Sequence, residues 1–443
     1  MKVHPAISLF TGLAVLLAAC STPPTPEAAA PQPTAAVESP VATAATAQET
    51  TAAVELTFWY PYGEGSDAGD FLADQIQAFN QANPGIVVSG QSYEDYASII
   101  EGIQRGAAGQ NLPSIAAIGF GYDDYIIDSG LAQPIEDYMG AGAGEFFGDI
   151  YPTLLDVTTH DGKVYGVPLA LSVAEVFYHP DLFEQAGLDP DNPPQTWDEF
   201  VQAAQTIHDE TGVYGAAFAL DDPWIFETAV RSNGAELLSA DGQTANLNSA
   251  TAIKVLQDWG DGAQNGAFLY NADFMQTLQS FGSQQIAMFA VSSYGTGYYH
   301  ANLPEVKAMA FPAGEGYTFQ SPAGGNSLYI LGNDDAERQA AAQFIAFLTS
   351  PEVNAAWAQT SGYLPVRASS LDAMQDYITG FENYELAVGL IQNVVPPTLW
   401  PSRHVLQVKQ ILLGTIESTM LGQQSAADAL QAANDQVNAL LAQ

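Results

Sequence analysis

Segments with the period of a β-strand alternate with segments with the period of a helix along most of this chain. Residues 54–60 are rich in strand-forming residues, and the apolar residues of 67–82 recur at helical spacing. The alternation continues over 86–118 and resumes at 164. This pattern predicts an α/β fold of mainly parallel sheets flanked by helices. The roughly 390 residues after position 53 are enough for two domains.

Individual elements follow from caps and periodicity. Thr196 and Glu199 have the capping-box spacing at the start of a helix predicted over 196–209. Other helices are expected at 93–107, 122–129, 180–186, 224–233, 334–348, 404–421 and 425–441, and strands at 164–171, 175–178, 286–291, 306–311 and 327–331. No repeat with a solenoid or propeller period is present.

The amino terminus has the features of a secretion signal. Lys2 precedes an apolar run at 7–19 that is too short to span a bilayer, and the run ends in Leu-Ala-Ala before Cys20. This ending is similar to bacterial lipoprotein signals, which implies that the signal is residues 1–19 and that Cys20 carries a lipid. An ordinary signal with a chance cysteine is the alternative. Residues 20–53, rich in Ala, Thr and Pro, are expected to be a disordered tether.

The acidic composition excludes one class of partner. Ten Lys and Arg face 50 Asp and Glu, a formal net charge of -40, so the basic surface needed to bind nucleic acid is missing. Acidic pairs such as Asp123-Asp124 and Asp221-Asp222 stand beside predicted helix starts, where we expect a solvated face. Cys20 is the only cysteine, so no disulfide and no thiolate metal site is expected.

The sequence carries no recognisable catalytic motif. Its six histidines are dispersed without zinc-site spacing, and neither a Gly-x-Ser-x-Gly elbow nor a Gly-x-x-x-x-Gly-Lys loop occurs. A glycosidase-type carboxylate pair stays open, because the distance between two carboxylates depends on the tertiary structure. We predict a protein that is not an enzyme and that uses no cofactor and no metal.

Several short blocks stand in a fixed order after the tether. They are Asn-Gln-Ala-Asn-Pro-Gly at 80–85, Gly-Val-Pro at 166–168, residues 177–188, Pro-Gln-Thr-Trp-Asp-Glu-Phe at 194–200, residues 281–288, Gly-Gly-Asn-Ser at 324–327 and Ser-Gly-Tyr-Leu-Pro-Val at 361–366. In this order they resemble the extracellular solute-binding proteins of ABC importers, family 1, which include maltose-binding and glycerol-phosphate-binding proteins.

The resemblance implies a two-lobed periplasmic-binding-protein-like fold of type II. About three chain crossings would join the lobes, and a solute would bind between them. By analogy one lobe comprises 54–170 plus 310–350, and the other 171–309 plus 351–443. The expected partners are a small solute and the ABC permease, and the protein is expected to be a monomer on the outer face of the cytoplasmic membrane, held there by its lipid alone.

Candidate contact residues come from matching positions in the glycerol-phosphate-binding branch, which this chain resembles most. The resemblance implies contacts from Tyr93, Ser172, Ser292 or Ser293, Gly325, Asn326 and Tyr363, with Arg403 near an arginine that grips phosphate. The branch's carboxylate for glycerol hydroxyls falls at Phe120, a departure that puts glycerol phosphate itself in doubt. A salt bridge for Arg403 and helix capping for the serines are the structural alternatives.

Aromatic residues at predicted strand ends and in loops add further candidates. Trp59, Phe120 and Trp224 could stack on a sugar or polyol, although such residues also build cores. We therefore predict the capture of a carbohydrate or polyol-type solute. A phosphorylated polyol or glycerophosphodiester, or a cationic solute drawn by the acidic field, is the alternative. A surface glycoside hydrolase is a further alternative.

Overall fold

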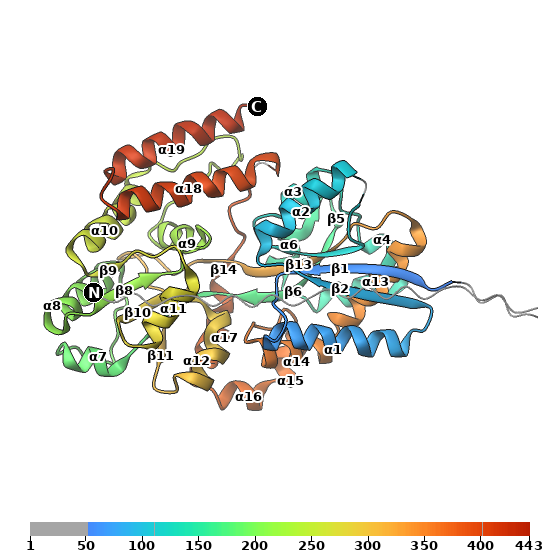
Figure 1. Ribbon diagram of the computed structural model, residues 1–443, viewed down its shortest axis with the longest axis horizontal. Helices are drawn as coiled ribbons and strands as arrows, with labels where there is room; N and C mark the ends of the chain where they lie inside the picture. Colours follow the sequence, from blue (N-terminus) through green and yellow to red (C-terminus); the bar gives the residue numbers. More distant parts are fainter. Residues whose placement is uncertain (1–51, 110, 401) are drawn as a thin grey trace, which may run out of the picture. The chain divides into compact units, whose positions relative to one another are not determined.

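The computed structural model describes residues 52–109, 111–400 and 402–443, with the backbone alone for Ser402. The predicted signal at 1–19, Cys20 and the tether, apart from its last two residues, lie outside this range. Residues Thr51–Gln443 form one compact unit, drawn in Figure 1. Among the described residues, no helix is both long enough and apolar enough to cross a membrane.

A first five-stranded sheet has the order β2-β1-β3-β13-β6. Its strands are β1 (Val54–Tyr60), β2 (Ile86–Ser92), β3 (Ile115–Gly119), β6 (Gly166–Ser172) and β13 (Gly324–Ile330). β1 pairs in parallel with β2 and β3, whereas β13 pairs antiparallel with β3 and β6. One strand, β13, therefore runs against the others. We call this sheet and the helices packed on it the first lobe.

The sheet of the second lobe has the order β11-β7-β10-β8-β9. Its strands are β7 (Ala174–Tyr178), β8 (Tyr214–Phe218), β9 (Phe268–Leu269), β10 (Ile286–Ser292) and β11 (Lys307–Ala310). β8 pairs in parallel with β9 and β10, and β7 pairs antiparallel with β10 and β11. In both sheets all strands but one run in the same direction, so the sheets are mainly parallel, as predicted. Only the pairs that involve β7 or β13 are antiparallel. β7 and β13 are reversed because the chain enters each directly after crossing from the other sheet.

Three segments of the described chain cross between the sheets. Val173 joins β6 to β7, β12 (Ser321–Pro322) precedes β13, and β14 (Val394–Val395) pairs in parallel with β12. The Ser321 hydroxyl oxygen accepts a hydrogen bond from the Ala174 N–H at 3.0 Å, which ties two of the crossings together. The crossings therefore form one connected set.

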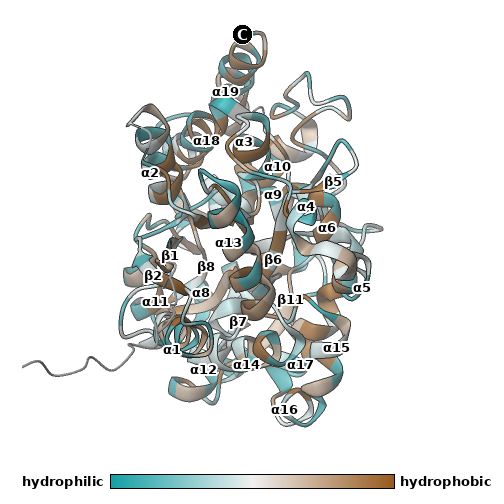
Figure 2. Cartoon of the chain, turned by 90° about the vertical axis from the view of Figure 1, so that its right-hand side faces the viewer, coloured by the Kyte–Doolittle hydropathy of each residue, from teal (hydrophilic) through white to brown (hydrophobic). Residues whose placement is uncertain are grey.

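Helices cover both sheets because each buries one apolar stripe. α1 (Asp67–Ala82) buries Leu72, Ile76 and Phe79, and its cap Ser66 accepts a hydrogen bond from the Gly69 N–H. The capping box predicted at Thr196 and Glu199 is present at the start of α8. In Figure 2 the helices carry both hydrophilic and hydrophobic residues, while β6 is mainly hydrophobic.

The remaining elements complete the two lobes. With the first sheet are α2 (Tyr96–Gly109), α3 (Asp123–Asp128), α4 (Glu136–Met139), η1 (Gly140–Gly142), α5 (Ala143–Gly148), α6 (Pro152–Thr158), β4 (Thr159–His160), β5 (Lys163–Val164) and α13 (Asp335–Leu348). With the second are α7 (Pro180–Gln185), α8 (Trp197–Thr211), α9 (Trp224–Ser232), α10 (Ala250–Asn265), α11 (Phe274–Gly282), η2 (Ser293–Gly295), α12 (Thr296–Asn302), α18 (Val405–Met420) and α19 (Ala426–Leu441).

Part of the carboxyl-terminal region packs differently from the division expected from sequence. α14 (Pro351–Ser361) packs on α1, and its Trp357 belongs to the same buried cluster as Phe58 of β1. All of 351–443 was expected in the second lobe. α18 and α19 do pack there, on α10, as Figure 1 shows. In sequence, the elements between α14 and α18 are α15 (Ala368–Ala373), α16 (Gln375–Thr379), α17 (Glu382–Gly389), η3 (Leu390–Asn393) and η4 (Ser402–His404).

Candidate functional site

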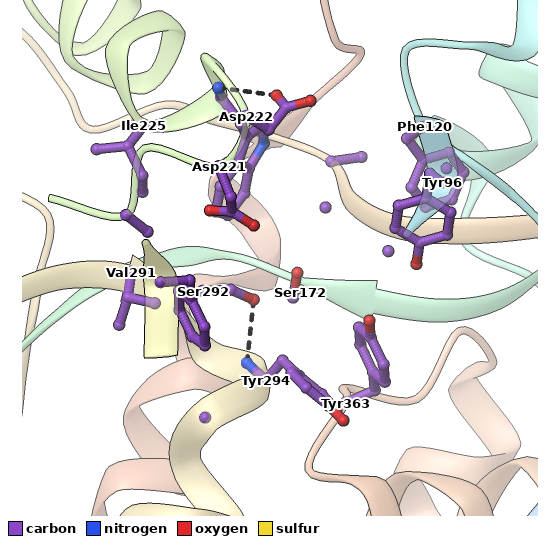
Figure 3. A pocket seen from close by; sticks show the side chains of 18 of the residues that line it. Tyr96, Phe120, Ser172, Asp221, Asp222, Ile225, Val291, Ser292, Tyr294 and Tyr363 are labelled. Carbon is purple, nitrogen blue, oxygen red and sulfur yellow. Dashed lines mark hydrogen bonds between the residues drawn. The ribbon is translucent and has the colours of Figure 1, made fainter. Parts of the chain in front are cut away.

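A cavity of about 730 Å³ is lined by residues of both lobes. Phe120 follows β3, Ser172 ends β6 and Ser292 ends β10, so the carboxyl ends of strands from both sheets face it. This is where open α/β sheets collect ligands. The volume is typical of a site for a small molecule. Figure 3 shows these side chains around the cavity.

Tyrosines form one wall of the cavity. The rings of Tyr294 and Tyr363 lie 4.4 Å apart at 31°. Asn326, buried behind them, donates hydrogen bonds from Nδ2 to the hydroxyls of Tyr62 at 2.5 Å and Tyr96 at 2.9 Å. Burial raises the pKa of Tyr96, Tyr294 and Tyr363. These hydroxyls therefore stay neutral and can both donate and accept hydrogen bonds.

Trp224, at the start of α9, also lines the cavity. The Asp222 carboxylate accepts a hydrogen bond from the backbone N–H of Trp224 at 3.0 Å. A side chain on Gly324 would come within 2.9 Å of the indole ring and 2.3 Å of the Ser172 hydroxyl. Glycine at 324 therefore lets the indole of the second lobe lie against the backbone of the first, close to Ser172.

Asp221 points into the middle of the cavity, as Figure 3 shows. Its carboxylate accepts no hydrogen bond from any other side chain in the described part of the chain, and it forms no salt bridge there. The side chain is open to the cavity, but the surrounding walls desolvate it. This desolvation, with a smaller contribution from the charge of Asp222, raises the pKa of Asp221 to about 6.

Lys409 is the one lysine among the described residues that line the cavity. Its Nζ lies 2.6 Å from the Asp222 carboxylate and 4.4 Å from the centre of the Tyr122 ring. Burial alone would lower the pKa of Lys409, but the charge of Asp222 outweighs it and the pKa is raised. Lys409 is therefore a charged, already partnered group that links α18 of the second lobe to the first lobe at Tyr122.

Glu227 fastens the third crossing to the cavity wall. Its Oε1 accepts hydrogen bonds from the N–H and the hydroxyl of Thr398, each at 2.7 Å. Arg231 lies 3.3 Å from the same carboxylate and donates to the Pro396 carbonyl at 2.6 Å. α9, which carries Trp224, is thus bound to the segment that follows β14.

The cavity brings together six of the residues expected to contact a solute. These are Phe120, Ser172, Trp224, Ser292, Gly325 and Tyr363. The hydroxyl of Ser292 also accepts a hydrogen bond from the Tyr294 N–H at 3.1 Å, so the capping alternative for this serine holds as well. Gly325 has a φ of +104°, a backbone conformation that would be strained in any residue with a side chain. Its backbone itself therefore forms part of the cavity wall.

The other expected residues lie outside the cavity wall. Trp59 is buried in the core, and the half-buried Tyr93 rests on it with ring centres 4.9 Å apart. Tyr93 also precedes α2 instead of opening it, because the helix begins at Tyr96. Ser293 is fully buried and accepts a hydrogen bond from the Val173 N–H, and Asn326 supports the tyrosines from behind. Arg403 is exposed.

Several lining residues were missed or interpreted otherwise from sequence. Asp221 and Asp222 were expected on a solvated face beside a helix start. Asp222 does accept a hydrogen bond from the N–H of Trp224, the first residue of α9, yet both also line the cavity. Their position in the loop that follows β8 was the signal that could have identified them. Tyr96 and Lys409 lie within helices, where the sequence pattern alone gives no sign of a cavity.

Comparisons with known proteins agree with this geometry. A family model described as bacterial extracellular solute-binding protein matches residues 74–381. The sn-glycerol-3-phosphate-binding periplasmic protein UgpB of Agrobacterium fabrum is 26% identical over 86% of this chain and 90% of its own length.

Two solved structures share the fold. The cyclic alpha-maltosyl-1,6-maltose binding protein from Arthrobacter globiformis is 26% identical with a TM-score of 0.74, covering 88% of this chain and 99% of that one. UgpB from Mycobacterium tuberculosis, in complex with glycerophosphocholine, is 21% identical with a TM-score of 0.76, covering 87% and 98%. The names of these relatives are those of binding proteins and not of enzymes. Since the family model spans most of the two-lobed fold around the cavity, this chain belongs to the bacterial extracellular solute-binding protein family.

Proposed function

We propose that this protein captures a carbohydrate or polyol-type solute in the cavity and hands it to the membrane subunits of an ABC importer. The observation that carries the proposal is a cavity wall of aromatic rings with a few polar groups free to bind hydroxyls. Trp224, Tyr294 and Tyr363 offer ring faces, while Ser172 and Asp221 offer oxygen atoms. Sugar C–H faces stack on rings, and their hydroxyls need a few fixed partners.

Capture would work by closure of the lobes around the three crossings. The lining residues come from both lobes, so a solute that contacts both sides stabilises the closed arrangement over an open one. Fastening of the crossings by Ser321 and Glu227 supports this, because the hinge then moves as one connected set.

A phosphorylated polyol is a weaker candidate. Arg403, the residue expected to grip phosphate, is exposed and does not belong to the cavity wall. Lys409 does line the cavity, but Asp222 holds its ammonium at 2.6 Å. A phosphate would have to displace that carboxylate and approach the unpaired charge of Asp221. The names of the relatives divide between the two candidates, since the Arthrobacter protein binds a cyclic maltosyl sugar and the UgpB proteins bind glycerol 3-phosphate or glycerophosphocholine.

A thermal-shift screen of the purified full-length protein tests this proposal. Neutral sugars and polyols should be compared with phosphorylated polyols, amines and amino acids. A solute at a hundredfold its dissociation constant should add about 2.7 kcal/mol to the free energy of unfolding. Stabilisation by phosphorylated polyols alone would contradict the proposal. Release of a cleaved product from a bound oligosaccharide would instead support the hydrolase alternative.

The proposed location is the outer face of the cytoplasmic membrane, with the lipid on Cys20 as the only anchor and the protein a monomer. A single acyl chain binds a membrane only weakly and reversibly, whereas the diacylglycerol of a lipoprotein supplies two chains. The lipid on Cys20 would therefore be enough to hold the protein on the membrane. Replacing Cys20→Ser should release the protein from the membrane fraction. Retention of the variant in that fraction would contradict the proposed lipid anchor. Light scattering measures the mass of the purified protein and should give that of a monomer.

A further inference from the structure

Among the described residues that line the cavity, acidic side chains outnumber basic ones. The acidic residues are Asp67, Asp221, Asp222 and Glu227, against one lysine, Lys409. Asp222 is partnered by Lys409, and Glu227 by Arg231. Neither Asp67 nor Asp221 has such a partner in the described part of the chain, and of these two it is Asp221 that stands at the centre of the cavity in Figure 3.

The surroundings of Asp221 make its carboxylate a site for positive charge. Asp222 on the same loop and Asp95 on the loop before α2 face it with negative charge, and Lys409 of α18 faces it with positive charge. The positive charge of Lys409 is already balanced by Asp222 at 2.6 Å. A second cation near Asp221 would therefore lower the electrostatic energy of the site, whereas an anion would raise it.

The aromatic wall adds a second feature. Trp224 lies three residues after Asp221, and its indole nitrogen is already used in a hydrogen bond to the Pro322 carbonyl at 3.0 Å. The ring is therefore oriented by the crossing segment before any solute enters. Tryptophan is the aromatic residue that attracts cations most strongly across its ring face.

We propose that the preferred solute is an amino-substituted carbohydrate or polyol, whose protonated amine binds the Asp221 carboxylate next to Trp224. This inference rests on the proposed function and narrows its solute class. A charge-assisted hydrogen bond is roughly twice as strong as a neutral one. A neutral sugar of the same shape would occupy the same cavity without that bond.

Matched pairs of probes test the inference on the full-length protein. Glucosamine is compared with glucose, and the fully deacetylated chitosan disaccharide with cellobiose, by isothermal titration near neutral pH at low and high salt. Each amine should bind at least about tenfold more tightly than its neutral partner. High salt should weaken the amines more than the neutral sugars, because only the amines gain from charge attraction.

Two variants locate the effect. Asp221→Asn should reduce the preference for the amine by about tenfold, with a smaller loss for the neutral sugar. Asp74→Asn makes the same change of net charge on the exposed surface of α1, and it should leave the preference intact. If both variants reduce the preference equally, the overall charge of the protein selects the amine and Asp221 does not.

The remaining outcomes separate this inference from the proposed function. Equal affinity for amine and neutral partner overturns the inference and leaves carbohydrate binding in place. Failure of all four probes overturns the inference, and stabilisation by other neutral sugars in the screen would show that carbohydrate binding survives. A preference that persists in Asp221→Asn would assign amine recognition to another residue.

Discussion

The indole Nε1 of Trp224 donates a hydrogen bond to the carbonyl oxygen of Pro322 at 3.0 Å. Trp224 begins a helix of the second lobe, and Pro322 lies in a crossing segment that leads into the first. One side chain therefore both forms the cavity wall and touches the hinge, so a solute that contacts the ring acts directly on the connection between the lobes.

Replacing Trp224 by alanine should weaken binding of the solute found in the thermal-shift screen by at least about tenfold. The variant loses the ring face and the hydrogen bond to Pro322 together. Trp224→Phe keeps a ring and should lose less. Isothermal titration measures both, with Tyr214→Ala as a control at an exposed residue outside the cavity. Wild-type affinity in Trp224→Ala would remove Trp224 from the proposed site.

Lys409→Met should destabilise the protein by about 1–2 kcal/mol, because Asp222 is left without its partner in a partly buried place. The figure lies below that of fully buried pairs because 36% of the Asp222 side chain is exposed. Urea unfolding measures the loss. The double variant Lys409→Met/Asp222→Asn should recover part of it. Lys163→Met breaks an exposed pair with Asp137 and should cost less than about 1 kcal/mol.

Glu175→Met should stabilise the protein at neutral pH by about 1–3 kcal/mol. Glu175 is fully buried on β7, and neither carboxyl oxygen has a hydrogen-bonding partner in the described part of the chain. Burial raises its pKa well above the usual range. A methionine of similar size removes the unpaired polar group without leaving a cavity. A lower free energy of unfolding for the variant would show that the carboxyl group is stabilised in the native protein.

The free energy of unfolding should rise as the pH is lowered from about 8 to about 5. Burial raises the pKa of Asp123 to about 7, even though Tyr329 and the Gly121 N–H donate hydrogen bonds to it. The unfolded chain has the lower pKa, so the folded protein binds more protons between about pH 4 and 7. The stability from this group is complete below the unfolded pKa and is lost as the pH rises through about 7.

Asp123→Asn should flatten this dependence by at most about 1.4 kcal/mol per pH unit. Urea unfolding across the pH range measures the slope, and Asp74→Asn serves as a surface control. An unchanged slope in Asp123→Asn would mean that other carboxyl groups, such as Asp124 with its pKa raised to about 6 by burial, dominate the uptake of protons.

Substitution of two arginines should have different effects on stability. Arg403→Ala should change neither stability nor the affinity for glycerol 3-phosphate, because Arg403 is exposed outside the cavity. Arg367→Met should cost about 3 kcal/mol, because Arg367 is buried and donates to the carbonyls of Thr349 and Phe146. Thermal unfolding and isothermal titration measure both. A selective loss of phosphate affinity in Arg403→Ala would restore its predicted role.

Sequence alone was sufficient for the family and for much of the local structure, although it missed β8 and placed the start of α2 at Tyr93 instead of Tyr96. The helix at 67–82 and the capping box of Thr196 and Glu199 were predicted correctly, because periodicity and caps depend on residues a few positions apart. The candidate contact residues Ser172 and Gly325 were expected from the resemblance to the family, and both line the cavity.

Only the tertiary structure decided which charges face the cavity. Lys409 meets Asp222 across 187 positions of sequence, and this pairing leaves the neighbouring Asp221 without a salt bridge in the described part of the chain. Arg403, six positions before Lys409, ends up exposed. This difference between Lys409 and Arg403 depends on how distant segments of the chain pack. Local sequence patterns do not predict it, because burial and charge pairing arise only when the two lobes bring those segments together.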